Sequence, residues 1–240
     1  MGAGVRPHPS FPGVFFVTFE DGSRKIATVN LSSGRTVYGE RLVKVDDVEY
    51  RLWDPFRSKL AGAILKGLEN QPIKPDCKVL YLGAASGTTP SHVSDIIGLK
   101  GYVYCVEFAP RSIRDLINNV CRFRPNMAPI LADARFPTNY APMVETVDVV
   151  YCDIAQPEQA KILVDNARVF LHAGGWIVIA IKARSVDVAK EPSEVYKHEI
   201  GVLKRNSFEI YDVVHLEPYD KDHAMVTAKY VYKEKRNVSE

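Results

Sequence analysis

Short apolar runs alternate with segments of helical periodicity after residue 77, and this rhythm restricts the fold more than any other feature of the sequence. We expect strands at residues 78–82, 102–108, 128–132, 146–152 and 176–181. Helices are expected near residues 90–97, 110–122, 157–171 and 192–204, with Gly174-Gly175 ending the third. Such alternation predicts an α/β fold of Rossmann-like type, with a parallel sheet covered by helices on both faces.

Two last apolar runs, at residues 208–216 and 224–232, have no helical segment between them. They are expected to form an antiparallel hairpin at the edge of the sheet, because a parallel pair needs a long crossover connection. The sequence therefore predicts a mostly parallel sheet of seven strands that ends in an antiparallel hairpin.

The first fifty residues follow a different pattern, with short β-branched and aromatic runs separated by turn signals. Strands are expected at residues 14–19, 25–31, 42–45 and 48–52. We interpret residues 1–54 as a small β-meander domain and residues 55–240 as the α/β domain. Asp54 as N-cap and Pro55 as first helical residue predict a helix to about Glu69. Its apolar face would carry Phe56, Leu60, Ile64 and Leu68.

Charge and cysteine content exclude several classes of protein. Lys and Arg number 31 and Asp and Glu 29, a net charge of +2 that does not favour an autonomous nucleic-acid binder. No apolar run reaches membrane-span length and the first residues lack a signal-peptide core, so we expect a cytoplasmic protein without membrane contact. The four cysteines lack C-x-x-C spacing, which favours small buried side chains over a metal site. A disulfide stays open as an alternative.

A turn of small residues follows the strand expected at residues 78–82 and predicts a cofactor site. Its glycines, Gly83 and Gly87, are spaced G-x-x-x-G rather than G-x-G-x-x-G, which suits a cofactor without phosphates. Glu107 ends the next strand, where a carboxylate can accept both hydroxyl hydrogens of a ribose. Each of these residues alone has an ordinary alternative as a turn or a helix cap. The predicted cofactor-binding residues from this turn and strand are Gly83, Ala84, Thr88, Thr89, Glu107 and Phe108.

Acidic and small residues also follow the third and fourth strands. Asp133 lies where a side chain can reach an adenine edge, and Asp153 starts a short polar segment. Since four successive strand ends carry such residues, we interpret them together as a crevice for S-adenosylmethionine (SAM) rather than NAD. The cofactor-binding residues predicted here are Asp133, Ala134, Asp153, Ile154, Ala155 and Gln156.

At these positions the sequence resembles the fibrillarin family. The similar segments are Asp-Pro-Phe-Arg-Ser-Lys-Leu from Asp54, Val-Leu-Tyr-Leu-Gly-Ala-Ala-Ser-Gly-Thr-Thr from Val79, Ser-His-Val-Ser-Asp from Ser91, Val-Glu-Phe from Val106, Asp-Ala-Arg from Asp133, Asp-Ile-Ala-Gln-Pro from Asp153, Ile-Lys-Ala from Ile181 and Leu-Glu-Pro-Tyr from Leu216. They follow the family's order over about residues 50 to 233. The chain lacks the Gly/Arg-rich N-terminal extension of eukaryotic members, so it resembles the shorter archaeal type and a nucleolar location is not expected.

The resemblance implies a function and a set of partners. Fibrillarins methylate the ribose 2′-hydroxyl of rRNA at sites that a C/D-box guide RNA selects, and tRNA stays open as a further substrate. The implied partners are the guide RNA, a kink-turn-binding protein of ribosomal type and a coiled-coil Nop scaffold. The low net charge agrees with specificity supplied by partners. The β-meander is either part of the docking face or only a cover for the sheet edge.

The resemblance also implies the catalytic residues. Related ribose methyltransferases use Lys-Asp-Lys and a fourth residue, and the matching positions are Lys59, Asp153, Lys182 and His223. We expect Lys182 to be the base, since burial and a second ammonium favour its neutral amine, while Asp153 orients it. No metal is expected, because the sulfonium already activates the methyl group. The alternatives are a SAM enzyme for small molecules or proteins, and a scaffold without activity.

Overall fold

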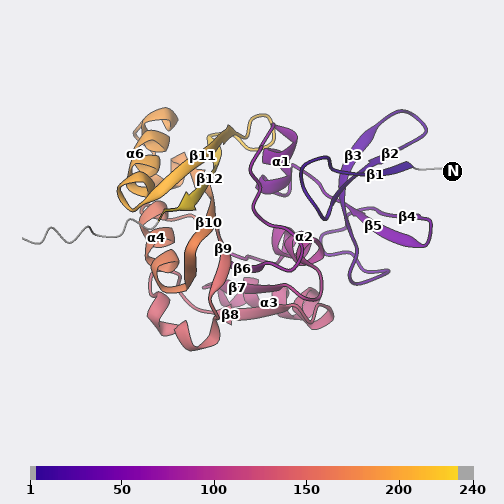
Figure 1. The fold of residues 1–240 in the computed structure, drawn as a ribbon, viewed down its shortest axis with the longest axis horizontal. Helices are drawn as coiled ribbons and strands as arrows, with labels where there is room; N and C mark the ends of the chain where they lie inside the picture. The colour runs from indigo at the N-terminus through magenta and orange to yellow at the C-terminus, as the bar shows by residue number, and fades with distance from the viewer. Residues whose placement is uncertain (1–3, 232–240) are drawn as a thin grey trace, which may run out of the picture.

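The computed structural model describes residues 4–231, and within them the chain forms two sheets (Figure 1). The larger sheet has seven strands in the order β11-β12-β10-β9-β6-β7-β8. Its parallel strands are β6 (Lys78–Leu82), β7 (Tyr102–Glu107), β8 (Met127–Leu131), β9 (Val147–Cys152) and β10 (Leu171–Lys182). The antiparallel strands β11 (Phe208–His215) and β12 (His223–Tyr230) complete it. The predicted fold class is confirmed.

The strand order reverses between β6 and β9, because the chain runs outward from β6 to β8 and then returns to pair β9 with the other side of β6. Open α/β sheets bind their ligands at such a switch point, outside the carboxyl ends of the strands. The topology therefore directs attention to the ends of β6 and β9.

Helices cover both faces of this sheet. One face carries α1 (Lys59–Leu65), α2 (Thr88–Ile97) and α3 (Pro110–Asn119), and the other carries α4 (Gln159–Phe170) and α6 (Pro192–Arg205), while α5 (Ala183–Val186) is a single turn after β10. Successive strand residues alternate between the two apolar clusters, so Tyr81 packs on one face and Leu80 on the other. Burial on both faces explains the continuous apolar runs of the sequence.

The glycines Gly174 and Gly175 do not end α4, contrary to the sequence prediction. The helix ends at Phe170, and both glycines lie inside β10, where the pairing with β9 shifts register between Leu171 and Trp176. Gly174 has φ +78°, and a Cβ at Gly175 would lie 2.6 Å from the Leu171 side chain. The glycines therefore permit a bulge in the strand rather than a helix cap.

The helix predicted from Asp54 to Glu69 is shorter. It begins at Lys59 with Ser58 as N-cap and ends at Leu65. The Asp54 carboxylate instead accepts a hydrogen bond from the backbone N–H of Phe56 at 2.9 Å, an Asx turn that imitates a helix start in sequence. Phe56 is 66% exposed and does not belong to the apolar face, whereas Leu60, Ile64 and Leu68 are buried as predicted.

The smaller sheet is not a simple meander. Its five strands are β1 (Gly4–Pro7), β2 (Val14–Thr18), β3 (Arg24–Val29), β4 (Leu42–Val45) and β5 (Val48–Leu52), in the order β1-β2-β3-β5-β4. Asp46 and Asp47 both have positive φ and form a tight hairpin, which returns β5 to the side of β3 and leaves β4 at the edge. Strand β1 was not expected from the sequence. The domain boundary at residue 54 stays a prediction.

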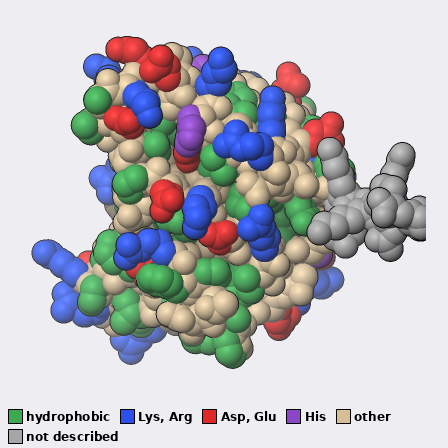
Figure 2. Space-filling model, turned by 90° about the vertical axis from the view of Figure 1, so that its left-hand side faces the viewer, with side chains coloured by type: hydrophobic (Ala, Val, Ile, Leu, Met, Phe, Trp, Pro, Cys, Tyr) green, Lys and Arg blue, Asp and Glu red, His purple; other side chains and the backbone are tan. Residues whose placement is uncertain are grey.

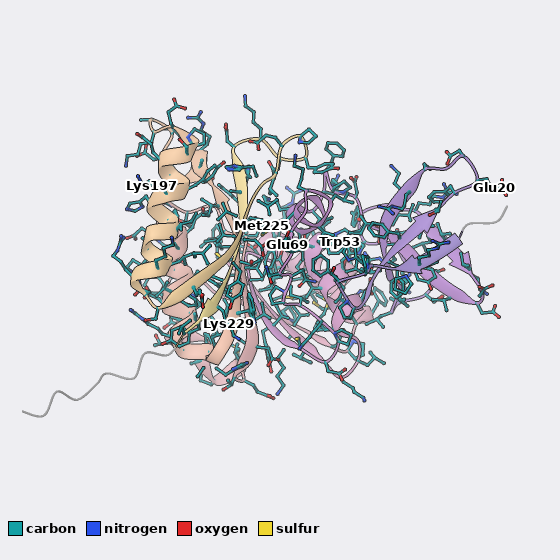
Figure 3. All side chains as sticks on the ribbon, turned by 45° about the horizontal axis from the view of Figure 1, so that its top comes forward. Glu20, Trp53, Glu69, Lys197, Met225 and Lys229 are labelled. Carbon is teal, nitrogen blue, oxygen red and sulfur yellow. The ribbon has the colours of Figure 1, made fainter. Side chains whose placement is uncertain are left out.

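The two sheets meet through a shared buried interface. Trp53, which follows β5, lies where the two parts of the molecule join (Figure 3) and stacks on His92 of α2 with ring centroids 4.8 Å apart. Phe11, Val14 and Ile26 belong to the same apolar cluster as the α1 and α2 side chains. The interface also contains a buried polar group, which we call the junction cluster: Thr28, Arg51, His92, Asp95 and Arg124.

The surface carries both signs of charge. Figure 2 views the molecule from the left of Figure 1, where α4 and α6 lie, and Lys and Arg side chains are interspersed there with Asp and Glu. This mixture agrees with the net charge of +2. Among the described residues, no helix combines the length and apolarity needed to cross a bilayer.

Candidate active site

A pocket of about 260 Å³ opens at the carboxyl ends of β6 to β9, at the switch point of the sheet. Most residues predicted to bind a cofactor line it, and each comes from the end of a strand or the loop after it. They are Gly83, Glu107, Phe108, Asp133, Ala134, Asp153, Ile154, Ala155 and Gln156. The structure therefore brings together side chains that are separated by up to 73 residues in the sequence.

Three residues of the predicted set lie outside the pocket wall. Ala84 is buried behind the turn, Thr88 is the first residue of α2, and the Thr89 hydroxyl donates a hydrogen bond to Ser58 Oγ at 2.9 Å. The pocket also contains residues that were not predicted to bind the cofactor. Four of them adjoin predicted positions in the sequence, namely Ala85, Val106, Ala132 and Arg135, whereas Ile162 of α4 had no such signal.

The turn after β6 forms one wall. Gly83 has φ +82°, and a Cβ there would lie 2.9 Å from the carbonyl oxygen of Asp153, so only glycine allows β6 and β9 to approach so closely. Ala85 also has positive φ, and its backbone N–H donates to the Glu107 carboxylate at 2.9 Å. The turn and the end of β7 are thus joined across the pocket floor.

Glu107 is held in one orientation. One carboxylate oxygen accepts from the Ala85 N–H at 2.9 Å and the other accepts from the Ala109 N–H at 2.8 Å. Each ionised oxygen can accept more than one hydrogen bond, so capacity remains on the side that lines the pocket. This carboxylate fits a pair of neighbouring hydroxyl groups, the chemistry of a ribose.

Phe108 and Asp133 form the outer part of the pocket. The Phe108 ring is 65% exposed and offers an apolar surface at the rim. Asp133 accepts hydrogen bonds from the Arg135 guanidinium at 2.6 and 3.0 Å, and these bonds, together with the Arg135 backbone N–H and charge, hold the pKa of Asp133 below its usual value despite some burial. Asp133 is therefore ionised and fixed beside a flat apolar surface.

Where β9 and β10 end, two lysines contact one carboxylate. Lys182 Nζ lies 2.8 Å from Asp153 Oδ1 and donates to the Asp153 carbonyl oxygen at 2.7 Å. Lys59 Nζ, from the first residue of α1, lies 3.2 Å from the same Oδ1. The side chains of Asp153 and Lys182 are 15% exposed and that of Lys59 is 19% exposed. The structure thus assembles three of the four predicted catalytic residues directly.

The fourth, His223, joins them through a residue that the sequence reasoning missed. Asp220 Oδ1 lies 3.0 Å from His223 Nδ1, and Asp220 Oδ2 lies 3.6 Å from Lys59 Nζ. His223 is also the register partner of Lys182 in the β10–β12 pair. An acid three residues before the predicted histidine was the only signal in sequence. We call Lys59, Asp153, Lys182, Asp220 and His223 the mouth cluster.

The charges of the mouth cluster stabilise one another. Burial lowers the pKa of Lys59, but the carboxylates of Asp153 and Asp220 outweigh burial and raise it above its ordinary value. Burial likewise raises the pKa of Asp220, but the hydrogen bond and charge of His223, with the charge of Lys59, bring it below its usual range. Lys59 is therefore the ammonium that two carboxylates hold in the charged form.

The sequence favoured buried cysteines over a metal site and left a disulfide open as an alternative. Within residues 4–231, no three or more His, Cys, Asp or Glu side chains are arranged to hold a metal ion. All four cysteines are free thiols, and Cys77, Cys105 and Cys152 are buried. This agrees with the interpretation of the cysteines as small core side chains.

Comparison with known proteins gives one consistent result. The fibrillarin family model matches residues 5–232. A "Fibrillarin-like rRNA/tRNA 2′-O-methyltransferase" of Sulfurisphaera tokodaii is 59% identical over 220 residues, which is 92% of this chain and 94% of that protein. Aeropyrum pernix fibrillarin, solved with natively bound S-adenosyl-L-methionine, has a TM-score of 0.89 at 56% identity and covers 95% of this chain and 99% of its own. A fibrillarin/Nop5p complex gives a TM-score of 0.79 at 42% identity, over 87% and 94% of the two chains. The chain belongs to the fibrillarin family.

Proposed function

We propose that this protein is a SAM-dependent RNA methyltransferase that acts on the ribose 2′-hydroxyl. The observation that carries the proposal is the contact of Lys59 and Lys182 with one carboxylate, Asp153, which lines a pocket that fits a nucleoside. The relative from Sulfurisphaera tokodaii is named for this reaction on rRNA and tRNA. We therefore assign rRNA, and by the same name tRNA, as the substrate class.

The pocket fits the cofactor on the chemistry of its residues. Glu107 would accept hydrogen bonds from the two ribose hydroxyls, Phe108 would cover the adenine, and Asp133 with Ala134 would face its edge. Asp153 and Gln156 line the end of the pocket nearest to the lysines. When bound, SAM supplies a methyl group that its sulfonium has already activated.

Within the mouth cluster, the two lysines have different tasks. Lys59 faces two carboxylates and keeps its proton, whereas Lys182 faces only Asp153 and lies near a permanent ammonium. Since Lys182 lines the pocket and contacts Asp153, we assign it as the group that accepts the proton of the 2′-hydroxyl as the oxygen attacks. Asp153 holds both amines in place. His223 fixes Asp220, which in turn fixes Lys59.

Target selection requires partners. The chain has a net charge of +2, and affinity for RNA depends on the number of phosphates that a protein neutralises. A fibrillarin that is 42% identical has been solved as a complex with Nop5p, which supports a Nop scaffold as a partner here. We include a C/D-box guide RNA and a kink-turn-binding protein in the same proposed assembly. Cytoplasmic location stays a prediction.

Radiolabelled methyl transfer tests this function. The assembled scaffold, kink-turn protein, guide RNA and this chain should label a paired target RNA, and a target with 2′-deoxyribose at the selected nucleotide should stay unlabelled. The chain alone should label either RNA weakly. Equal labelling of the deoxy target would contradict ribose methylation, and efficient site-specific labelling by the chain alone would contradict the need for partners.

A further inference from the structure

Two aromatic side chains at the rim of the active site have no part in the chemistry described above. Phe56 is 66% exposed, and its ring meets that of Tyr219 edge-on, with centroids 5.1 Å apart and an interplanar angle of 74°. Both residues belong to segments that the sequence analysis singled out, Asp54 to Leu60 and Leu216 to Tyr219. Tyr219 is half-buried, so it supports the exposed Phe56 ring, and a supported exposed ring of this kind indicates a surface that is covered by a ligand or partner.

Local hydrogen bonds hold both rings in place. The Asp54 carboxylate accepts from the Phe56 N–H at 2.9 Å, and the Asp54 carbonyl accepts from the Arg57 N–H at 3.1 Å. The Tyr219 N–H donates to the Leu216 carbonyl at 2.8 Å. A Cβ at Gly62 would lie 3.3 Å from the Tyr219 side chain, so Tyr219 packs closely on α1 where glycine leaves room.

The same two segments carry the mouth cluster. Phe56 precedes Lys59 by three residues, and Tyr219 directly precedes Asp220, which contacts both Lys59 and His223. The exposed cations Arg57 and Lys221 lie within two residues of the rings along the chain. The surface next to the catalytic lysines therefore carries the exposed Phe56 ring with both cations and the exposed acids Asp54 and Glu217 beside it.

Which part of the RNA the Phe56 and Tyr219 rings can contact depends on whether the target strand is single or paired. In the function proposed above, the target strand is paired with a guide RNA, and this inference rests on that function. Paired bases are stacked inside the duplex, so they offer no free ring face. The 2′-hydroxyls of an A-form duplex lie in its wide, shallow minor groove, and the surface presented there consists of riboses and base edges.

We propose that Phe56 and Tyr219 pack against the riboses that flank the target nucleotide in the minor groove of the guide–target duplex. The rings add contact area that binds the strand beside the mouth cluster, and the flanking cations Arg57 and Lys221 meet the phosphates on either side. A contact with sugar faces is independent of base sequence, which suits an enzyme whose targets are selected by pairing.

Steady-state and single-turnover methylation by the assembled complex test this inference. Phe56→Ala should raise KM for the paired RNA about tenfold, the contribution expected from burying a phenyl ring. The single-turnover rate at saturating RNA should change little, and SAM affinity, thermal unfolding and assembly with the scaffold should equal those of the parent. Phe56→Leu should restore most of the KM, because sugar packing needs apolar area rather than a π system. Tyr211→Ala, which removes an exposed ring on β11 instead, is the matched control and should leave KM unchanged.

Each other outcome overturns the inference. An unchanged KM for Phe56→Ala shows that the ring does not touch RNA, and weaker assembly with the scaffold shows that it binds protein. Recovery by Phe56→Trp but not by Phe56→Leu shows base stacking instead. If the parent complex itself methylates no paired RNA, the proposed function fails, and that failure is distinct from any effect of Phe56.

Discussion

The junction cluster and the mouth cluster share one design, a carboxylate contacted by two cations, and differ in the kind of cation. Asp95 receives Arg51 at 2.8 Å and Arg124 at 2.5 Å, whereas Asp153 receives Lys182 at 2.8 Å and Lys59 at 3.2 Å. An arginine in a protein stays charged, while a lysine changes its protonation when its surroundings favour it. The chain thus has arginines at the buried junction, where charge is permanent, and lysines at the site for which we propose proton transfer to Lys182.

The two carboxylates, Asp95 and Asp153, also differ in their burial and in the number of hydrogen bonds that they accept. Asp95 and Arg51 have fully buried side chains, and Asp95 also accepts from the Thr28 hydroxyl at 2.8 Å and the Leu31 N–H at 3.1 Å. Within residues 4–231, the Asp153 carboxylate accepts from side chains only through the two lysines, and the cluster borders the pocket. A satisfied buried network stabilises one structure, whereas a partly exposed one keeps capacity for a substrate.

The largest effect is expected from exchanging the cation at the active site. Lys182→Arg keeps the charge but cannot accept a proton, so methyl transfer should fall by about 10²-fold or more. Single-turnover assays would measure the rate, and calorimetry should show unchanged SAM affinity. If Lys182→Arg kept the parent rate of methyl transfer, Lys182 would not be the proton acceptor. The difference between lysine and arginine in the two clusters would then not reflect proton transfer.

Removing the carboxylate at the junction should affect folding instead. Asp95→Asn leaves Arg124 buried without its counter-charge, while Arg51 keeps only Glu40, and breaking a buried ion pair typically costs about 3–5 kcal/mol of stability. Asp153→Asn, the matched change at the mouth, should cost far less stability and abolish activity. Denaturant unfolding of both variants would measure the difference, and equal losses of stability would contradict the comparison.

A third variant sharpens the comparison by affecting neither cluster. Glu107→Ala should weaken SAM binding by about 1–3 kcal/mol, because the charged hydrogen bonds to the ribose are lost. Calorimetry measures this directly. Unchanged affinity would show that Glu107 only supports the Ala85 and Ala109 backbone.

The smallest effect concerns pH. His92 is fully buried between the Thr28 hydroxyl and the Tyr38 hydroxyl, and burial, with the charges of Arg51 and Arg124, holds its pKa well below the usual value. Its neutral form contributes stability above the unfolded pKa near 6.5, and this contribution is lost as pH falls below that value. Between pH 6.5 and 5.5 the protein should lose about 1 kcal/mol more than His92→Gln does. If the free energies of unfolding of the parent and of His92→Gln changed equally with pH, His92 would not be the source of the pH dependence.

The α/β part of the fold could be predicted closely from the sequence, because parallel strands buried on both faces are continuous apolar runs. The start of α1 could not, since Asp54-Pro55 has the residue types of a helix start and forms an Asx turn instead. The pairing of β3 with β5 could not be predicted either, because the segment between them includes β4 and no local sequence pattern indicates which strand lies beside β3.

The candidate site also has residues that could be predicted from the sequence and residues that could not. Residues at strand ends, such as Glu107 and Asp153, were predictable because topology brings strand ends together. Asp220 lies in a loop, where a carboxylate is ordinary, so no pattern distinguished it. The junction cluster joins residues from Thr28 to Arg124, and such contacts between distant segments appear only in the folded chain.

The position of β12 has a consequence for synthesis. The strand lies between β10 and β11, its residues Ala224, Met225 and Val226 are completely buried, and it begins with His223 opposite Lys182. A ribosome makes it after every other described strand, so a nascent chain that ends before residue 220 already has the segments of the SAM pocket but lacks Asp220 and His223. The strand β12 and the loop before it thus complete both the seven-stranded sheet and the mouth cluster.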